Sequence, residues 1–435
     1  MSNAGYFKAI HAAKNKHWSS FLLGATPQSL WTAKRFPYGR TPPFFLSLPG
    51  ADTSPRIRLG YHPASLKGSN GIVLDKQGKP TYESPASFRI IVLIRIFSKI
   101  LERIISSRLL LVARLKGRLH PNHCGSLPGL STYDAVLTLF NNVKTLQRSR
   151  LKVSSLFLDI KAGFDNVDNS TLARILREGG IPPYLVSWVS SFLGEWSCTL
   201  VFQGAPGTPG LGNVGAPQGS PISPVLFLLY VAPLYFKIPR GLMISYVDDF
   251  ALTAASPSYR GNIHRLQMLF EKLEAKALRL GVPFSVAKPE LIHWRTPSQR
   301  HSPKCLSPIQ IKGLLFCLRD SVRWLGYWFT PALDSSAHFS PELALAQGAF
   351  VLIRHLSPPS AGLAPYLCHR LATFLIAPIL LYSADLLTPS ARAMAHLNTF
   401  WHKVQRWTTN CFSATPKGIL AVESCLPPVP LLISQ

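Results

Sequence analysis

Two adjacent carboxylates, Asp248 and Asp249, stand between two apolar runs, residues 242–244 and 250–252. The runs predict two short β-strands, so the aspartates are expected at the tip of a hairpin. Neighbouring acids among hydrophobic residues repel one another and lose hydration, and bound cations offset both costs. Oxygen-rich sites of this kind suit Mg²⁺. The alternative is a turn in which both aspartates simply face water.

A third aspartate, Asp159, directly follows the apolar run 156–158. Downstream, Asp168 or Asn169 can cap a helix that Gly179 ends, so the order is strand, acid, turn, helix. Asp159 is therefore predicted to lie at the end of a strand.

A turn-rich loop, residues 215–224, separates the two acidic segments and contains Gln218 and Gly219. It leads into the apolar run 225–230. Taken alone, the loop is also compatible with a plain connector.

In this order, the three segments resemble the palm of reverse transcriptases, most closely those of non-LTR (LINE-like) retrotransposons of fungal type. The resemblance covers about Leu59 to about Thr330. Further motifs that carry it are Gly78-Lys79-Pro80, Ser87-Phe88-Arg89-Ile90, residues 97–103 and 120–125, Leu130-Ser131-Thr132, Lys288-Pro289-Glu290 and residues 322–326. It implies an α+β fold: a right-hand polymerase palm, made of an antiparallel sheet with helices, with partial fingers and a helical C-terminal thumb.

The activity that the resemblance implies is RNA-directed DNA polymerisation, in which deoxynucleotides are added to a primer 3′-hydroxyl on an RNA template. Two Mg²⁺ ions about 3.5–4 Å apart, with Mn²⁺ able to substitute, clamp the attacking and leaving oxygens. By the resemblance, Asp159 and Asp248 bridge the ions and Asp249 supports the site. The backbone carbonyl of Ile160 is a further candidate ligand.

The resemblance also assigns roles around the nucleotide. The Phe164 ring excludes a ribose 2′-hydroxyl, and the alternative for Phe164 is a core aromatic residue. Gln218 and Gly219 lie against the incoming nucleotide and the template base, where glycine permits close backbone approach.

Basic side chains are expected on the triphosphate. Arg89, together with Lys76 or Lys79, would hold the phosphates, since arginine offers a fork and lysine a point charge. Solvated basic residues are the alternative for both lysines. Lys288 would protonate the departing pyrophosphate, although Pro289 follows it where the family has threonine.

Composition agrees with a polyanionic partner. The 435 residues include 46 Lys and Arg against 20 Asp and Glu, a formal charge of +26, which favours binding by counterion release. The net charge does not distinguish an RNA-binding protein from a DNA-binding protein. Seven scattered cysteines without a CxxC pair predict no zinc site, no disulfide framework and a reducing compartment. The apolar runs are too short to span a membrane, and we expect an intracellular ribonucleoprotein, nuclear or cytoplasmic and not secreted.

Apolar residues at helical spacing predict two amphipathic helices with a buried stripe: Ile263, Leu266, Phe270, Leu273 and Ala277 in the first, and Met394, Leu397, Trp401, Val404 and Trp407 in the second. The opposite face of the second helix is basic, and it is expected either to be solvated or to follow the template-primer backbone.

The predicted organisation has four parts. They are a linker-like, mostly irregular segment 1–58, partial fingers 59–150, a reverse transcriptase palm 151–330, and a helical thumb and C-terminal connector 331–435. The implied partners are an RNA template, a DNA or RNA primer and deoxynucleoside triphosphates.

Departures from the family predict a truncated copy. Endonuclease motifs and an RNase H segment are not found, and few residues separate Asp52 from Leu59, where relatives insert a long fingers segment. The Gly- and Pro-rich tract 207–212 adds to the picture of a decaying copy. The alternative function is therefore a catalytically inactive retroelement remnant that retains only nucleic-acid binding. An RNA-dependent RNA polymerase is disfavoured, because such enzymes usually have Gly-Asp-Asp at the hairpin.

Overall fold

The computed structural model describes residues 60–434, except 77–80, 85–86, 213–214, 236–237, 240, 286–288, 296–308, 312–313, 335–336, 357–362 and 385. Several predicted features lie outside the described residues. They are the N-terminal segment 1–58, the junction at which a fingers segment is expected to be missing, Lys79 and Lys288.

A six-stranded sheet forms the centre of the molecule, in the order β6-β7-β3-β8-β10-β9. Its strands are β3 (Lys152–Asp159), β6 (Met243–Tyr246), β7 (Asp249–Ser256), β8 (Glu290–Trp294), β9 (Ile309–Ile311) and β10 (Leu314–Leu318). All neighbouring pairs are antiparallel except β8 and β10. The predicted hairpin around the two aspartates is β6–β7. The predicted α+β class is therefore confirmed.

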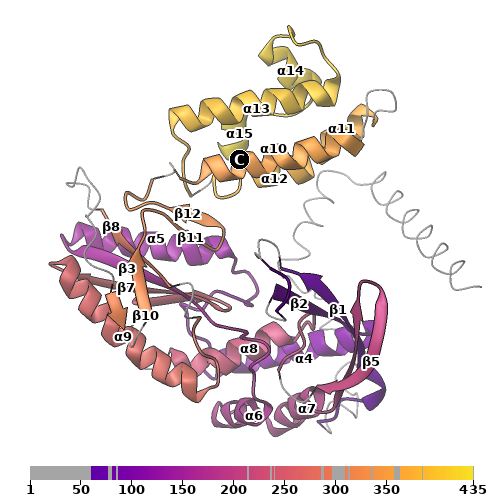
Figure 1. The fold of residues 1–435 in the computed structure, drawn as a ribbon, viewed down its shortest axis with the longest axis vertical. Coiled ribbons are helices and arrows are strands. Elements are labelled where there is room, and N and C mark those ends of the chain that lie inside the picture. The colour runs from indigo at the N-terminus through magenta and orange to yellow at the C-terminus, as the bar shows by residue number, and fades with distance from the viewer. Residues whose placement is uncertain are drawn as a thin grey trace, which may run out of the picture.

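Both faces of this sheet are buried, because alternate side chains of β3 enter two different cores. Leu156 and Leu158 belong to one core, and Val153 and Phe157 belong to the other. This alternation follows from the two-residue period of a strand. The first face is covered by α9 (Tyr259–Arg279) and the second by α5 (Thr132–Arg148) (Figure 1).

The helix α9 carries the stripe that its sequence predicts. Leu266, Phe270, Leu273 and Ala277 are buried along it, at the spacing of an amphipathic helix. The first core also receives α4 (Ile96–Leu115), α6 (Asn169–Glu178), α7 (Pro183–Leu193) and α8 (Ser223–Val231).

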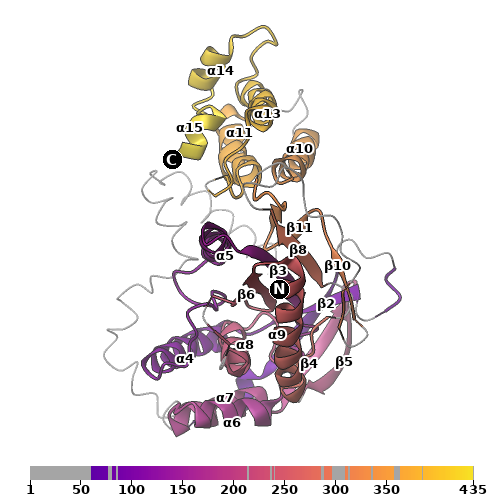
Figure 2. The ribbon, with the colours of Figure 1, turned by 90° about the vertical axis from the view of Figure 1, so that its left-hand side faces the viewer.

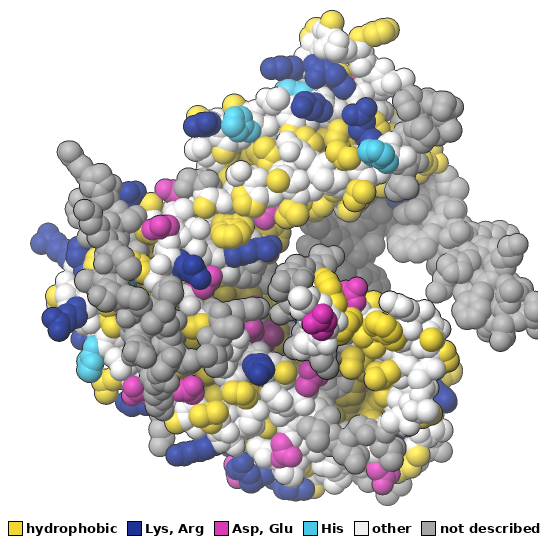
Figure 3. All heavy atoms as spheres, in the orientation of Figure 1, with side chains coloured by type: hydrophobic (Ala, Val, Ile, Leu, Met, Phe, Trp, Pro, Cys, Tyr) yellow, Lys and Arg dark blue, Asp and Glu magenta, His cyan; other side chains and the backbone are white. Residues whose placement is uncertain are grey.

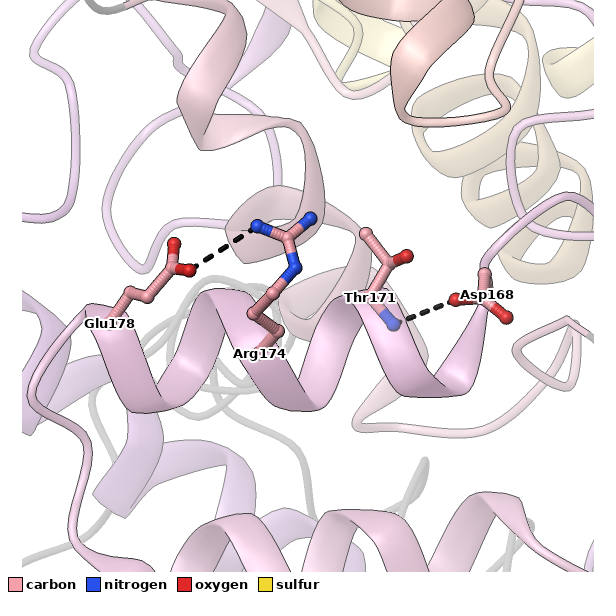
Figure 4. A network of polar contacts seen from close by, with 4 residues as sticks. All are labelled: Asp168, Thr171, Arg174 and Glu178. Carbon is pink, nitrogen blue, oxygen red and sulfur yellow. Dashed lines mark hydrogen bonds and ion pairs between the residues drawn. The ribbon is translucent and has the colours of Figure 1, made fainter.

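The helix α6 begins as predicted. Asp168 is its N-cap, and its carboxylate accepts a hydrogen bond from the Thr171 amide at 2.7 Å (Figure 4). Arg174 and Glu178 pair across one turn at 3.3 Å on the exposed side. The helix ends at Gly179, the predicted stop.

A second sheet has the order β2-β1-β4-β5. Its strands are β1 (Gly68–Asp75), β2 (Phe88–Leu93), β4 (Trp196–Phe202) and β5 (Ala205–Gly212). It therefore joins strands from both sides of residue 151, and the division into fingers and palm at that residue stays a prediction. The tract 207–212, interpreted from sequence as decay, lies in β5. Proline and glycine are tolerated there because β5 is an edge strand.

The C-terminal residues form a helical body beyond the six-stranded sheet (Figures 1 and 2). Its elements are α10 (Phe339–Leu356), α11 (Pro365–Leu371), a short π-helix (Ala372–Ile376), α12 (Ala377–Leu380), α13 (Ala391–Thr409), α14 (Lys417–Glu423) and α15 (Val429–Ser434). The hairpin of β11 (Val322–Trp324) and β12 (Tyr327–Phe329) connects it to the sheet. Leu397, Trp401 and Val404 are buried on α13, as its stripe predicts.

Within the described part of the chain, no helix combines the length and the apolar character that crossing a membrane requires. Five cysteines are free thiols: Cys124, Cys198, Cys368, Cys411 and Cys425.

A buried histidine at the start of the described chain allows a test of the packing. The His62 ring meets Trp188 and Phe192 edge-on, at centroid distances of 5.1 and 5.3 Å. Neither ring nitrogen has a hydrogen-bond partner among the described residues. Burial, and secondarily the charge of Lys67, lowers the pKa of His62 from 6.5 to about 4.

We expect His62→Phe to raise the free energy of unfolding by about 1 kcal/mol at pH 7, because it keeps the ring contacts and removes two unpartnered polar atoms. The gain should grow by about 2 kcal/mol at pH 5. Between pH 6.5 and 4, the unfolded histidine binds a proton that the folded one does not, so the parent loses stability as pH falls. Urea denaturation at both pH values measures this. A less stable variant at pH 7 would show that the ring nitrogens have partners.

Candidate active site

The hairpin tip is a two-residue turn. Tyr246 pairs with Asp249 in the β6–β7 register, which leaves Val247 and Asp248 as the turn residues. Val247 has φ +58°, a region in which β-branched residues are outliers. Tight hairpin turns usually place glycine, asparagine or aspartate at such a position. Backbone strain of this kind concentrates at functional sites.

The register of the sheet brings the three aspartates together at one end of it. Asp159 lies directly opposite Asp249, and the Ile160 amide donates to the Asp248 carbonyl oxygen at 3.1 Å. Asp159 and Asp249 are therefore a non-hydrogen-bonded pair, with Cα atoms only about 4.5 Å apart. All three aspartates are half-buried. Like charges directly opposite one another are destabilising. Placing these carboxylates together therefore lowers the stability of the fold, and packing alone gives no reason for it.

The carbonyl of Ile160 also faces this end of the sheet. Ile160 forms a bridge with Phe284, in which the Lys161 amide donates to Pro283 at 2.9 Å and the Ser285 amide donates to Asp159 at 2.7 Å. Because the neighbours of Ile160 make these bonds, its own N–H and C=O point to the other side. That side is occupied by Asp248.

Oxygen donors from two strands fit a divalent cation. Among the described residues, no three His, Cys, Asp or Glu side chains form a group that would hold an ion by themselves. Mg²⁺ does not require such a cage, because it usually binds through one or two carboxylates together with waters and substrate phosphates. The opposed pair Asp159 and Asp249, with Asp248 beside them, supplies that kind of donor set.

The turn packs against residues 120–125. The sequence resemblance includes this segment but predicts no role for it. This segment adds itself to the edge of β6: the Cys124 amide donates to Ser245 at 2.9 Å, and the Ser245 amide donates to Asn122 at 3.0 Å. A Cβ on Gly125 would lie 2.3 Å from the Val247 nitrogen. Only glycine fits there, and a lone glycine in a sequence gives no signal of such a contact.

A buried polar network fixes the same edge. The Tyr235 hydroxyl lies 2.6 Å from Nδ1 of His123 and also contacts the Ser245 hydroxyl. Burial, with a smaller contribution from His120, lowers the pKa of His123 to about 3. The ring is therefore neutral, and it holds the strand three residues before Asp248.

Phe164 lies between the aspartate strand and the loop. Its half-buried ring stacks on Phe227 at 5.0 Å, and its carbonyl oxygen accepts from the Ala216 amide at 2.8 Å. Gly163 leaves no room for a side chain, since a Cβ would lie 2.7 Å from the Phe227 ring. The ring is partly a core residue and partly accessible, so both interpretations made from the sequence remain.

The loop 217–220 is joined to β2. The Val92 amide donates to the Gln218 carbonyl at 2.6 Å. Gly219 has φ +112°, and a Cβ there would lie 2.5 Å from the Val92 oxygen. The Gln218 side-chain amide is 3.5 Å from an Asp165 carboxylate oxygen. Arg89, on the same strand β2, is exposed and pairs with Leu74 on β1.

The surface is hollowed between the C-terminal helices and the four-stranded sheet, and acidic side chains line part of the hollow (Figure 3). Lys, Arg and His side chains gather over the C-terminal helices in the same view. The β11–β12 hairpin joins the C-terminal helices to the six-stranded sheet: Trp324 packs on Phe157 of β3 at 5.6 Å, and the Tyr382 hydroxyl donates to the Leu325 carbonyl at 2.9 Å.

Comparison with known proteins adds two kinds of finding. Residues 74–329 match the family described as reverse transcriptase (RNA-dependent DNA polymerase). Two proteins of Drosophila melanogaster are similar to the chain. The probable RNA-directed DNA polymerase from transposon BS is 26% identical over 298 residues, which are 66% of this chain and 32% of that protein. The probable RNA-directed DNA polymerase from transposon X-element is 26% identical over 286 residues, 65% of this chain and 31% of that protein.

The chain thus spans about a third of the length of these curated relatives. Among solved structures, telomerase from Candida albicans in complex with a fragment of telomeric RNA aligns with a TM-score of 0.45 at 11% identity, over 85% of this chain and 68% of that one.

Proposed function

The chain belongs to the reverse transcriptase (RNA-dependent DNA polymerase) family, and from this premise we propose that it is the RNA-directed DNA polymerase domain of a non-LTR retrotransposon. The observation that carries the proposal is the β3–β7 register, which sets Asp159 opposite Asp249 and places Asp248 in the adjoining turn. That geometry supplies carboxylates from two strands, as nucleotidyl transfer requires.

Members of this family generally use divalent metal ions, and we propose Mg²⁺, with Mn²⁺ as a substitute. Asp159, Asp248 and Asp249 would hold the ions, together with the Ile160 carbonyl. When bound, the ions lower the barrier by activating the primer hydroxyl and neutralising charge on the leaving pyrophosphate. The chain itself orients the carboxylates through the strained turn at Val247 and the contact with Gly125.

The residues around the nucleotide have proposed roles of their own. Gln218 and Gly219 would lie against the templating base and the incoming deoxynucleotide. Arg89 and Lys79 would bind the triphosphate, and Lys288 would supply the proton to the leaving pyrophosphate. The Val92–Gln218 hydrogen bond supports this assignment, because it places the loop beside the strand that carries Arg89.

The nucleic acid is proposed to lie across the C-terminal helices as well. On α13, Arg392, His396 and Lys403 are exposed on the side opposite the buried stripe. A positively charged face of this kind contacts phosphates without reading sequence. The proposed ligand is an RNA template with a DNA or RNA primer.

A second candidate, the inactive remnant, is favoured by one observation. The four-stranded sheet leaves large apolar side chains exposed, with Leu74 at 49%, Leu93 at 50% and Phe202 at 45% of their accessible surface. A sheet normally buries at least one such face. This exposure agrees with the expectation that a fingers segment is missing before Leu59.

Primer extension on homopolymer RNA separates the two candidates. We expect RNA binding that weakens with salt. A plot of the logarithm of the binding constant against the logarithm of the salt concentration should have a slope of about −0.7 for each neutralised phosphate of a single strand. Extension should occur but be slow, roughly a hundredfold below that of a chimera that carries a relative's fingers segment between Ala51 and Leu59, because misplacement by about 1 Å costs that much. Salt-sensitive binding without extension by either protein would favour the remnant.

Sugar selection provides a further prediction. In Phe164→Val, the smaller side chain should admit a 2′-hydroxyl, because the ring excludes it by clash. The ratio of ribonucleotide to deoxynucleotide incorporation should rise roughly tenfold or more, in line with what steric exclusion by one side chain contributes. Single-turnover rates with both nucleotide classes measure this ratio. An unchanged ratio in an active variant would assign Phe164 to the core, with Phe227→Leu as the control for lost stacking.

A further inference from the structure

A buried carboxyl on α4, outside the site described above, contacts the loop that carries Gln218 and Gly219. Glu102 is fully buried. One of its oxygens accepts a hydrogen bond from Ser98 at 2.7 Å, and the other accepts one from Ser220 at 2.5 Å. Ser98 lies on the same helix, whereas Ser220 directly follows Gly219. The carboxyl therefore connects the helix to a loop 118 residues further along the chain.

Placing this group in the core is costly. Burial raises the pKa of Glu102, and the hydroxyls of Ser220 and Ser98, with the charge of Lys99, act in the opposite direction. An apolar side chain of similar volume would fill such a space without the desolvation penalty. We therefore look for the reason for this carboxyl in the group that it binds outside its own helix, which is the Ser220 hydroxyl.

The loop is held from several sides at once. The Ser220 hydroxyl accepts from the Ile222 amide at 3.3 Å, at the start of α8. The Ser220 amide donates to Pro217 at 3.2 Å, which makes residues 217–220 one turn. Across the loop, the Val92 amide donates to Gln218, and Gly219 has no clearance from Val92. Glu102 bonds to Ser220 and Val92 bonds to Gln218, so contacts from α4 and from β2 together set the position of the turn.

We propose that Glu102 is a positioning residue, which clamps the 217–220 turn through Ser220 so that Gln218 and Gly219 meet the incoming deoxynucleotide at a fixed distance. This inference rests on the proposed function for the nucleotide contact. The clamp itself is a statement about the folded protein and is tested without catalysis.

Two matched variants isolate the contact. Ser220→Ala removes the hydroxyl that joins the carboxyl to the loop. Ser98→Ala removes the other hydroxyl from the same carboxyl and leaves the loop untouched. Each variant deprives the buried carboxyl of one donor, and Ser220→Ala also removes the acceptor of the Ile222 amide, so both variants should lower the melting temperature, Ser220→Ala somewhat more. A merely structural role for Glu102 predicts that the two variants behave alike in every other measurement.

The clamp predicts that they differ. In Ser220→Ala, the KM for the deoxynucleotide should rise about tenfold with kcat changed less than about twofold, since the hydrogen bond that joins the turn to the buried carboxyl is lost. In Ser98→Ala, KM should stay at the parent value. The hydrogen-exchange rate of the Val92 amide should increase in Ser220→Ala alone, because that amide is bonded to the loop and not to Ser220.

The exchange measurement distinguishes failure of the clamp from failure of the proposed function. Faster exchange at Val92 in Ser220→Ala alone, with no nucleotide addition by the parent, would leave the clamp standing and contradict the proposed function. Equal exchange at Val92 in both variants would overturn the clamp. So would equal KM values in active variants.

Discussion

Asp248→Asn is expected to reduce primer extension by roughly a thousandfold or more, because several kcal/mol of transition-state stabilisation depend on the lost carboxylate. RNA affinity should stay within about twofold of the parent, since the substitution does not touch the basic surfaces that contact phosphates. Stability should not fall. Three carboxylates lie close together at this end of the sheet, and neutralising one of them relieves repulsion. The melting temperature should therefore be unchanged or slightly higher.

The matched control is Asp168→Asn, the same substitution at the N-cap of α6. Asparagine caps a helix as well as aspartate does, so extension and stability should both match the parent. Single-turnover extension, RNA titration and thermal melting on the three proteins give the comparison. If Asp248→Asn lost RNA binding and extension together, or extended primers at the parent rate, the assignment of Asp248 to the metal site would be wrong.

Gly125→Ala is expected to damage the same turn from outside. The new Cβ would lie 2.3 Å from the Val247 nitrogen and 2.7 Å from its side chain, so the backbone of the turn must move. Overpacking of this kind costs about 1–3 kcal/mol of stability. Displacing the carboxylates by about 1 Å should slow extension roughly a hundredfold. Melting curves and single-turnover rates measure both effects.

Gly348→Ala is the control for this substitution. Nothing lies within 4 Å of a Cβ on Gly348, which is inside α10, and alanine in a helix is more favourable than glycine by about 1 kcal/mol. The control should melt higher and extend primers at the parent rate. A Gly125→Ala protein with parental extension would show that residues 120–125 do not hold the turn.

Local signals in the sequence predicted a large part of this architecture. The apolar runs beside Asp248 and Asp249 predicted the hairpin, the order of polar residues predicted the Asp168 cap, and helical spacing predicted the buried face of α9. Each of these signals lies within about twenty residues of the feature that it predicts. The strand end at Asp159 belongs to the same class, because an apolar run leads directly into it.

Contacts between distant segments were not predictable in the same way. Gly125 on Val247 and Glu102 on Ser220 each join segments more than a hundred residues apart, and no periodicity links them. The tract 207–212 was not predicted as a strand, because the position of β5 at a sheet edge, where proline is tolerated, depends on its pairing with β4. The roles of Lys79 and Lys288 stay predictions, because both residues lie outside the described part of the chain.

The most direct test of the central claim is addition of a single deoxynucleotide to a DNA primer annealed to four RNA templates that differ only in the templating base. With Mg²⁺ and enzyme in excess over primer, we predict that each template directs addition of its complementary deoxynucleotide, and that Asp248→Asn adds it roughly a thousandfold or more slowly under the same conditions. Absence of addition by the parent with either Mg²⁺ or Mn²⁺, while the protein binds the primed template, would contradict the account. Addition by Asp248→Asn at the parent rate would contradict it equally.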